Sequence, residues 1–483
     1  MIPEHLVCSR RAFLRALGVS VAASALSGCA TTPARNVLFI AIDDMNDWTG
    51  DLGGHPQART PHIDALGRRG VLFTNAHSPA TSCGAARAAI LTGIRPYTSG
   101  IYANRDPLRR ALPDAVTLPQ HFMQHRYHSA GAGKIFHGSD PGSWTEFYPS
   151  KRKSNRPPDP DPGVELPMNG IHWKGALDWG PIAVEDAEMS DGQVATWVAR
   201  WLHRSPAAPF FLACGIRRPH DPFFVPKRYF DLFPLDEIQL PAVYDDDLDD
   251  VPDAGRKMVD AERHRTILRH GQWRNAVQGY LASIAFADEQ IGTVIRALDE
   301  SGRDADTIVV LWTDHGFHLG EKSHWRKDTL WEEATRVPFI VVAPGVTRPG
   351  SRCARPVNLI DLYPTLIELC DLAPRNETAG VSLVPLLHDP DAAWDRPSIT
   401  TNGRGNNAAR DQHWRYIRYA NGTDELYDHR TDPFERANLA DHPEYAHEVA
   451  RLAEWLPDES VRPTYRRTRK STRGDGVRGR FDK

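Results

Sequence analysis

The chain contains 483 residues, of which 41% are hydrophobic and 25% are charged, and its formal net charge at pH 7 is −4. This length suits one large domain accompanied by a smaller one. A slightly negative chain lacks the positive field that draws proteins to nucleic acid, so we expect no nucleic-acid partner.

Residues 1–29 form a predicted export signal. Ser9–Leu14 contains a twin arginine followed by Phe-Leu, the pattern of a Tat signal, and the apolar run that continues to Ala25 is too short to span a bilayer. Leu26–Cys29 (LSGC) resembles a bacterial lipobox, which would attach a lipid to Cys29 and make it the mature N-terminus. The alternative is simple cleavage with release into the periplasm. We therefore expect a protein of the bacterial cell envelope, periplasmic or anchored to the membrane by its N-terminal lipid, and exported by the Tat translocase.

Strands that alternate with helices follow the signal. Asn36–Ile42 is a continuous apolar run, typical of a strand buried on both faces in a parallel sheet. Thr60–Leu66 provides an N-cap and a proline for the first turn of a helix. Further strands are predicted at Val71–Thr74, Phe210–Ala213, Thr307–Leu311 and Phe339–Val342, and further helices at Ala85–Leu91, Gln193–His203, Ala276–Leu298 and from Asp361 onward. This alternation predicts an α/β fold with a large mixed, mostly parallel sheet and helices on both faces.

The composition changes towards the C-terminus. Short antiparallel strands are predicted at Trp414–Tyr419 and Glu425–Asp428, so we expect a main domain over 34–390 and an α+β subdomain with a short antiparallel sheet over 391–460. Residues 461–483 form a basic tail that is too polar to fold, and it is either a solvated tail or attracted to an anionic polysaccharide or headgroups. Two Pro- and Asp-rich stretches, 138–181 and 233–255, are expected to be surface insertions that either shape a substrate pocket or serve only structure.

The six cysteines do not predict a disulfide framework or a zinc site. Cys8 lies in the signal and Cys29 would carry the lipid. At most one disulfide is expected among Cys214, Cys353 and Cys370, with Cys353–Cys370 as the suggested pair.

Carboxylates follow two of the predicted strands. Asp43 and Asp44 come directly after the first strand, and Thr313–Gly316 (TDHG) follows the strand that ends at Leu311. The carboxyl ends of strands in an open α/β sheet meet at one edge, where ligand sites gather. Two carboxylates about 4 Å apart repel by roughly 4 kcal/mol at an effective dielectric constant of about 20, and a divalent cation removes that cost. The alternative for the aspartate pair alone is one buried capping residue and one solvent-exposed residue.

Ser82–Arg87 (SCGAAR), followed by Leu91–Gly93 (LTG), is the most distinctive segment of the chain. Alone it predicts a Cys-Gly turn that opens a helix, because good helix formers follow. Three more segments are distinctive, namely Gly133–His137 (GKIFH), Arg218–Phe223 (RPHDPF) and His324–Lys327 (HWRK). Each of these alone is more often a surface charge or a core histidine.

Together, and in this order, these segments resemble the type I sulfatase family, the formylglycine-dependent members of the alkaline phosphatase superfamily, and most closely its iduronate-2-sulfatase branch. The family's pattern at the first segment is Cys or Ser, any residue, Pro, any residue, Arg, and then Leu-Thr-Gly. Here Ala85 takes the place of the proline, a variant that the family's maturation enzymes accept in some cases. The resemblance covers nearly the whole mature chain and implies an alkaline-phosphatase-like fold.

The resemblance implies that Cys83 is oxidised to formylglycine by a formylglycine-generating enzyme or an anaerobic sulfatase-maturating enzyme. A hydrated aldehyde carries two hydroxyls on one carbon, one to attack sulfur and one to release the sulfated intermediate. The resemblance also implies a bound Ca²⁺, an ion that suits oxygen-rich ligation. Its ligands would be Asp43, Asp44, the modified Cys83, Asp314 and His315.

The resemblance assigns roles to six catalytic residues, namely Cys83, Arg87, Lys134, His137, His220 and Lys327. Arg87 would hold the diol, and His137 would take the proton of its second hydroxyl. His220 would protonate the leaving alcohol, which matters because a sugar alcohol is a poor leaving group. Lys134, His220 and Lys327 would also bind the substrate, whose anionic sulfate needs fixed positive charge.

We therefore expect a calcium-dependent sulfatase, a sulfuric ester hydrolase, that acts on the sulfate monoesters of a sulfated carbohydrate such as a glycosaminoglycan. One alternative is a formylglycine-dependent phosphodiesterase or phosphonate monoester hydrolase of the same superfamily. A second alternative, from another functional class, is an inactive, lipid-anchored glycan-binding relative that keeps the fold.

Overall fold

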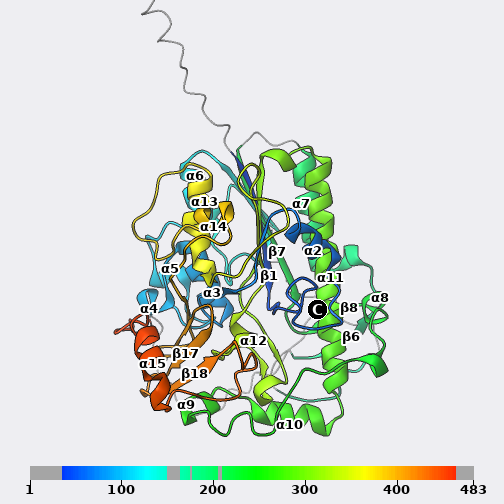
Figure 1. Ribbon diagram of the computed structural model, residues 1–483. Coiled ribbons are helices and arrows are strands. Elements are labelled where there is room, and N and C mark those ends of the chain that lie inside the picture. Colours follow the sequence, from blue (N-terminus) through cyan, green and yellow to red (C-terminus); the bar gives the residue numbers. More distant parts are fainter. Residues whose placement is uncertain (1–34, 150–163, 174–176, 205–208, 464–483) are drawn as a thin grey trace, which may run out of the picture. The chain divides into compact units, whose positions relative to one another are not determined.

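An eight-stranded sheet forms the centre of the fold (Figure 1). The computed structural model describes residues 35–149, 164–173, 177–204 and 209–463. The predicted signal region 1–29, with its lipid at Cys29, and the basic tail from residue 464 onward lie outside the described residues. Among the helices that are described, none combines the length and the apolar composition needed to cross a membrane.

The sheet is mixed and mostly parallel, as predicted. Its strands, in spatial order, are β13 (Ser351–Cys353), β2 (Val71–Phe73), β12 (Phe339–Val342), β9 (Thr307–Thr313), β1 (Asn36–Asp43), β7 (Phe210–Pro219), β4 (His128–Gly133) and β5 (Glu146–Tyr148). Strand β12 runs antiparallel to both of its neighbours, β9 and β2, and the other neighbouring pairs are parallel.

Strand β1 shows why helices cover both faces of the sheet. All eight of its residues are buried, and side chains that alternate along it enter two different cores. Val37 and Phe39 pack with the helices on one face, and Leu38 and Ile40 pack with those on the other. The first face carries α3 (Cys83–Thr92), α6 (Leu118–Gln124), α13 (Leu362–Leu369) and α14 (Val384–His388), and the second carries α2 (Pro61–Gly67), α7 (Ser190–His203) and α11 (Trp273–Glu300) (Figure 1).

The predicted helices and strands of this domain are confirmed, with boundaries that differ by a few residues. Three strands of the large sheet, β4, β5 and β13, were not predicted, and the longest of them is the glycine-rich β4. A Cβ on Gly133 would lie 2.0 Å from the Gly215 carbonyl oxygen, and one on Gly131 would lie 2.8 Å from the Trp144 ring. The close approach of β7 and Trp144 therefore demands glycine, which removes the apolar pattern by which a strand is recognised.

The parallel pairing brings the ends of four strands to one edge of the sheet. Ile42 of β1 pairs with Thr313 of β9, and Gly133 of β4 pairs with Gly215 of β7. The residues that follow β1, β4, β7 and β9 therefore emerge together at the carboxyl edge. These residues belong to the distinctive segments of the sequence, including GKIFH, RPHDPF and TDHG.

A second, four-stranded antiparallel sheet lies near the C-terminus, where two of its strands were predicted. It consists of β15 (Ser398–Thr401), β16 (Asn407–Arg410), β17 (Trp414–Arg418) and β18 (Asp424–Asp428), and α15 (Ala446–Ala453) packs on it. From Arg35 onward the chain is one compact unit, so a domain boundary at residue 390 stays a prediction.

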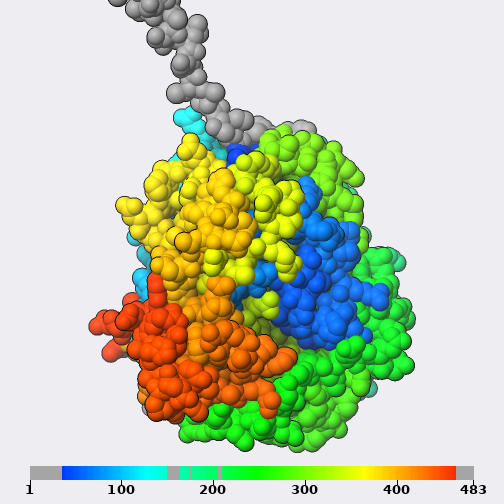
Figure 2. Space-filling view, in the orientation of Figure 1, coloured from blue at the N-terminus to red at the C-terminus, as the bar shows by residue number. Residues whose placement is uncertain are grey.

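The predicted insertion over 233–255 packs against this C-terminal sheet. Val251 is buried with Ile417 and Tyr427, and Asp247 forms a buried ion pair with Lys322. Figure 2 shows the orange and red C-terminal residues in direct contact with the green residues of this region. The stretch thus serves structure over part of its length. Much of the other insertion, 150–163 and 174–176, lies outside the described residues.

The remaining elements are short. The strands are β3 (Ala76–His77), β6 (Trp179–Ile182), β8 (Phe223–Pro226), β10 (His318–Leu319), β11 (Trp325–Arg326) and β14 (Val357–Asn358). The helices are α4 (Pro96–Ser99), α5 (Leu108–Ala111), α8 (Lys227–Phe230), α9 (Asp253–Arg256), α10 (Ala261–Arg269) and α12 (Glu332–Thr335).

The suggested Cys353–Cys370 disulfide is wrong. The four cysteines in the described part of the chain are buried and free. Cys353 lies on β13, where its thiol donates to the Pro390 carbonyl, whereas Cys370 follows α13 and its thiol faces the Arg35 carbonyl. The expectation that the chain has no disulfide framework holds for these cysteines.

A buried ion network joins the C-terminal sheet to α12. The Arg415 guanidinium on β17 bonds to the carboxylates of Glu435 and Glu332, and Arg410 lies 3.3 Å from Glu332. Burial alone would raise the pKa of Glu332, but Arg410, His429 and Arg415 outweigh it and hold that pKa well below its usual value. The network therefore contributes stability that is present above the pKa of a free glutamate, about 4.3, and is lost as the pH falls through the lowered pKa.

Replacing Arg415 with methionine is expected to lower the free energy of unfolding by about 3–5 kcal/mol, because two carboxylates lose the buried cation that they share. Thermal and chemical denaturation measure the loss. Arg418→Met on the same strand is the matched control, since Arg418 is 41% exposed and its pair with Asp424 contributes only about 0–1 kcal/mol. Equal losses in the two variants would contradict a stabilising role for the network.

Candidate active site

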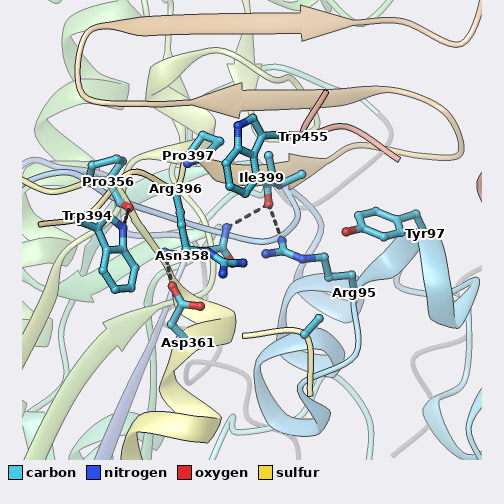
Figure 3. A pocket seen from close by; sticks show the side chains of 11 residues that line it. Arg95, Tyr97, Pro356, Asn358, Asp361, Trp394, Arg396, Pro397, Ile399 and Trp455 are labelled. Atoms are coloured by element: carbon cyan, nitrogen blue, oxygen red, sulfur yellow. Dashed lines mark hydrogen bonds between the residues drawn. The ribbon is translucent and has the colours of Figure 1, made fainter. Parts of the chain in front are cut away.

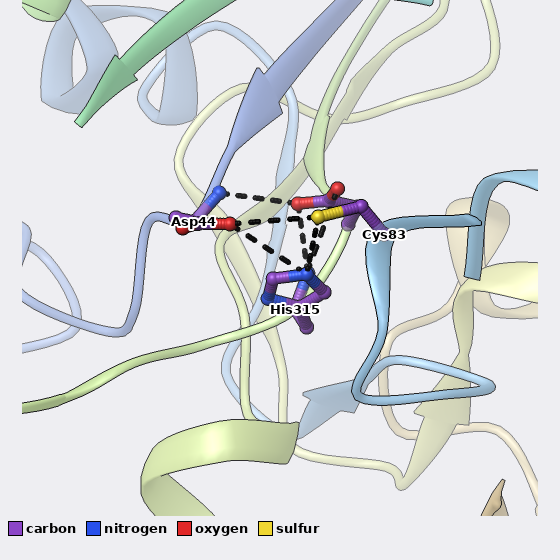
Figure 4. Close-up of side chains that lie close together, drawn as sticks. Asp44, Cys83 and His315 are labelled. Atoms are coloured by element: carbon purple, nitrogen blue, oxygen red, sulfur yellow. Dashed lines mark hydrogen bonds and ion pairs between the residues drawn. The ribbon is translucent and has the colours of Figure 1, made fainter. Parts of the chain in front are cut away.

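Cys83 is the first residue of α3 and lies at the carboxyl edge of the large sheet. Its side chain is fully buried, and its Sγ lies 3.2 Å from His315 Nε2, 3.3 Å from Lys327 Nζ and 3.8 Å from Asp44 Oδ1. Figure 4 shows Asp44, Cys83 and His315 converging from separate segments. The structure therefore surrounds Cys83 with charged groups from three different loops.

The residues next to Cys83 explain its position. Ser82 occupies the N-cap position with an extended backbone (φ −131°, ψ 127°), and its hydroxyl and the Gly84 N–H both donate to Asn104 Oδ1, at 3.2 Å and 2.7 Å. A Cβ on Gly84 would lie 2.9 Å from the Asn104 Cα, so the close approach of this loop requires glycine. Ala85, which replaces the proline of the pattern that this segment resembles, is buried among apolar residues that include Ala80 and Ile101.

The carboxylates come from the loops after β1 and β9. Asp44 has a left-handed backbone (φ +63°), which a non-glycine residue adopts only where its surroundings hold it. Its N–H donates to Asp314 Oδ1 at 3.1 Å, and the Tyr280 hydroxyl donates to its carbonyl at 2.7 Å. Gly316, two residues after Asp314, lies so close to the Glu333 carbonyl oxygen that a Cβ would be 1.9 Å from it. These contacts hold Asp44 and Asp314 next to each other.

Four of the five predicted metal ligands form one cluster. Asp44, Cys83, Asp314 and His315 each offer a ligand atom, and these atoms lie within 4.8 Å of one another. Asp43, the fifth, forms a neighbouring cluster with Asp44 and His220 on the same geometric criterion. The three carboxylates provide the hard oxygen donors that Ca²⁺ prefers.

Two lysines supply positive charge to these carboxylates. The Lys327 ammonium lies 2.5 Å and 2.7 Å from the two Asp44 carboxylate oxygens, and the Lys134 ammonium bonds to Asp43. Both lysines are at least 90% buried. Residues with positive φ, Arg326 and Asp328, flank Lys327 and direct it inward. The carboxylates of the cluster thus attract cations. This attraction supports the fit of the site to a divalent ion.

Arg87 is buried beneath the carboxylates, one helical turn after Cys83. Its Nε lies 2.8 Å from Asp314 Oδ2 and its Nη2 lies 3.2 Å from Asp43 Oδ1. The other donors of the guanidinium bond to the carbonyls of Ile42, Lys134 and Ile135. No described hydrogen bond of Arg87 reaches residue 83, so its visible role is to hold the aspartates in place.

His220 lies on the open side of the cluster, with 13% of its side chain exposed. Its Nε2 is 3.9 Å from Asp44 Oδ2, and its Nδ1 is 2.9 Å from Asp221 Oδ1. Burial alone would lower the pKa of His220, but the carboxylates of Asp44, Asp43 and Asp221 raise it to about 9. The imidazole can therefore carry a proton near neutral pH and present it from Nε2.

The site stabilises negative charge at residue 83. Burial alone would raise the pKa of the Cys83 thiol, but Lys134, Lys327 and His315 outweigh it and hold the pKa well below its usual value. A side-chain hydrogen bond from His137 acts in the same direction. His137 itself is exposed.

Sequence reasoning assigned no role to three residues of the site, Asp221, Arg326 and Tyr280. His220 Nδ1 bonds to the backbone carbonyl of Asp221 at 2.6 Å and lies 2.9 Å from its Oδ1, and the Arg326 guanidinium lies 3.2 Å from the other carboxylate oxygen. The signal for Asp221 was its place beside His220 in the RPHDPF phrase. Tyr280, which holds Asp44, lies within a long helix 236 residues away in sequence, and no local pattern distinguishes it.

Protein-family models match most of the chain. A model described as Sulfatase matches residues 35–372, and one described as N-sulphoglucosamine sulphohydrolase, C-terminal, matches residues 320–462. The first match contains all the residues of the cluster around Cys83.

Curated proteins and solved structures agree with this match. A "Sulfatase" from Formosa agariphila is 37% identical over 87% of this chain and 86% of its own length. The human iduronate 2-sulfatase is 30% identical over 71% of this chain and 70% of its own length. The structure of a phosphonate monoester hydrolase of Agrobacterium radiobacter superposes with a TM-score of 0.71 at 22% identity, covering 87% of this chain and 94% of that chain, and so shares the fold.

Proposed function

Because this chain belongs to the sulfatase family, we propose that it is a formylglycine- and Ca²⁺-dependent hydrolase of the sulfate monoesters of a sulfated carbohydrate. Membership of the family, with curated sulfatases among the relatives, makes the chain a sulfuric ester hydrolase in class. The single observation that carries the finer proposal is the position of Cys83, buried among two lysines and three aspartates at the start of α3.

Two groups outside the standard side chains complete the proposed chemistry. Formylglycine at Cys83 supplies, as its hydrate, a nucleophilic hydroxyl and a second hydroxyl whose deprotonation expels sulfate. Asp43, Asp44, Asp314 and His315 would hold a Ca²⁺, which would supply positive charge for the nucleophile and the sulfate. Arg87 holds two of these carboxylates in position through its ion pairs with Asp43 and Asp314.

The remaining side chains bind the sulfate and move protons. Lys134 and Lys327 place ammonium groups next to residue 83, where they offset the charge of the non-bridging sulfate oxygens. His137 accepts the proton of the second hydroxyl, since it is hydrogen-bonded to residue 83 and open to solvent. His220 donates a proton to the leaving alcohol from its Nε2.

A glycan is proposed as substrate because of the leaving group and the relatives. The protonated His220 is needed most for a sugar alcohol, which is a poor leaving group without a proton. The human relative named for iduronate supports the same class of substrate.

The proposal is tested by release of inorganic sulfate from a panel of sulfated oligosaccharides, with a phosphate diester offered to the same preparation. The protein is produced together with a maturation enzyme. Faster turnover of a sulfate ester is expected. Faster turnover of the diester would favour the phosphodiesterase alternative, and glycan binding without turnover of either would favour an inactive binding protein.

The cellular setting is part of the proposal. The twin-arginine signal and the LSGC phrase support export by the Tat translocase and lipid attachment at Cys29, which would hold the enzyme in the bacterial cell envelope. Tat translocates folded proteins, so maturation of Cys83 would precede export. Labelling with a radioactive fatty acid, lost in Cys29→Ala, tests the lipid anchor.

Replacing Asp221 with asparagine is expected to lower kcat/KM for a sugar sulfate about 10–100-fold, because His220 loses a carboxylate charge that raises its pKa and so holds its proton. An aryl sulfate should lose far less, since a phenolate leaves without a proton. Steady-state kinetics on both substrates measure this split. Asp231→Asn, an exposed aspartate on the protein surface, is the control. Equal losses on both substrates would assign Asp221 a purely structural role.

A further inference from the structure

A pocket of about 170 Å³ lies beyond the end of α3 that is remote from Cys83. Helix α3 has ten residues, which correspond to about 15 Å of helix axis. Gly93 ends the helix with a left-handed backbone (φ +72°), and Arg95, two residues later, lines the pocket. The pocket is therefore separate from the cluster around Cys83.

Two arginines give this pocket a positive charge. Arg95 is 9% exposed, and its Nη1 donates to the Ile399 carbonyl at 3.2 Å. The side chains of Arg95 and Arg396 both extend towards the middle of the pocket (Figure 3). Within the described part of the chain, neither guanidinium has a carboxylate within 4.0 Å.

The carboxylate that lines the pocket, Asp361, cancels only part of this charge, since both guanidinium groups act on it electrostatically. Asp361 accepts hydrogen bonds from the backbone N–H groups of Asn358, at 3.0 Å, and Val381, at 2.8 Å. Its oxygens are thus used within the fold, and two guanidinium groups face one carboxylate. Two guanidinium groups against one carboxylate leave a surplus positive charge, so the pocket is suited to an oxyanion that bonds to both guanidinium groups.

Aromatic rings border the same pocket. Trp455 is 38% exposed, and the Arg396 guanidinium lies 5.7 Å from its ring centroid. The Trp394 ring is fixed by a hydrogen bond of 2.8 Å from its Nε1 to the Pro356 carbonyl. Rigid aromatic faces beside a charged group provide the apolar surface and the orienting polar contacts that a sugar ring needs.

We propose that this pocket is a second, non-catalytic binding site for an anionic sugar unit of the sulfated glycan. The sulfate or carboxylate of that unit bonds to Arg95 and Arg396, and its ring packs against Trp455. The volume is below the roughly 300–1,000 Å³ of sites for drug-sized ligands, so the pocket takes one charged unit of a longer chain. The choice of a glycan rests on the proposed function, whereas the preference for an oxyanion rests on the two arginines.

The test measures the affinity of a fluorescent heparin-derived octasaccharide by anisotropy, in the full chain carrying Cys83→Ala so that no ligand is consumed. Arg396→Ala and Trp455→Ala are each expected to weaken binding about tenfold or more. Both side chains are partly exposed, and thermal unfolding verifies that each variant is folded. Arg200→Ala removes an exposed arginine from α7, which does not line the pocket, and is expected to change affinity by less than about twofold.

Competition distinguishes the sources of the oxyanion. Binding is expected to be displaced by unlabelled octasaccharide and neither by inorganic sulfate nor by the desulfated octasaccharide at the same concentration. Displacement by sulfate alone would overturn the glycan assignment. Unchanged affinity in Arg396→Ala and Trp455→Ala, or an equal loss in Arg200→Ala, would overturn the pocket as a binding site. Failure of the proposed function appears separately, as no turnover of any sulfate ester by the enzyme that retains Cys83.

Discussion

Replacing Cys83 with alanine is expected to reduce the turnover of sulfate esters by a factor on the order of 10⁴ or more, because no other side chain supplies the nucleophile. Cys83 is the point at which Lys327, His315 and Asp44 converge, so its removal leaves the charged site intact but without the reacting group. Release of sulfate from an oligosaccharide and from an aryl sulfate measures the loss.

The control for this variant is a second buried cysteine. Cys214 lies in β7, paired with Ile40 and Ala132 in the apolar core, and takes no part in the site. Cys214→Ala is expected to retain turnover close to that of the unmodified sequence, with a modest loss of stability from the small cavity. If Cys83→Ala retained turnover, the reaction would not depend on residue 83.

Replacing Asp314 with asparagine is expected to abolish stoichiometric Ca²⁺ binding and to lower turnover by a factor on the order of 10²–10³. The change removes one carboxylate from the cluster of Asp44, Cys83, Asp314 and His315, and with it the ion pair to Arg87 Nε. Element analysis after dialysis measures the bound ion, and kinetics with added CaCl₂ show whether a weakened site can still be filled.

Asp288→Asn is the matched control for this experiment. Asp288 is also a buried aspartate, but its carboxylate accepts hydrogen bonds from the N–H groups of His62 and Ile63 at the start of α2. Its replacement is expected to leave the Ca²⁺ content unchanged. An Asp314→Asn protein that kept both its ion and its turnover would contradict the assignment of Asp314 as a ligand.

Much of the fold follows from the sequence because the main elements carry clear patterns. The apolar run of β1 and the helical periodicity of α11 are long and regular, so local reasoning finds them. Strand β4 was not predicted, because its contacts with β7 and Trp144 require glycine in place of apolar side chains. The ion network of Arg415 and the pocket lined by Arg95 and Arg396 were not predicted either, since each depends on residues far apart in the sequence.

The site was predictable in composition and less so in geometry. Phrases that follow β1, β4, β7 and β9 identify its residues, because parallel strands bring these phrases to one edge. The bonds of Arg87 could not be derived in the same way. The resemblance implied that Arg87 holds the diol of residue 83, whereas the folded chain directs the guanidinium to Asp43 and Asp314 beneath it.

The most direct test of the account is the mass of the peptide that spans Cys83, taken from active protein produced with a maturation enzyme. The account predicts the mass decrease that corresponds to conversion of the thiol to an aldehyde, with turnover rising in proportion to the converted fraction. An unmodified thiol in a preparation that hydrolyses sulfate esters at full rate would contradict it.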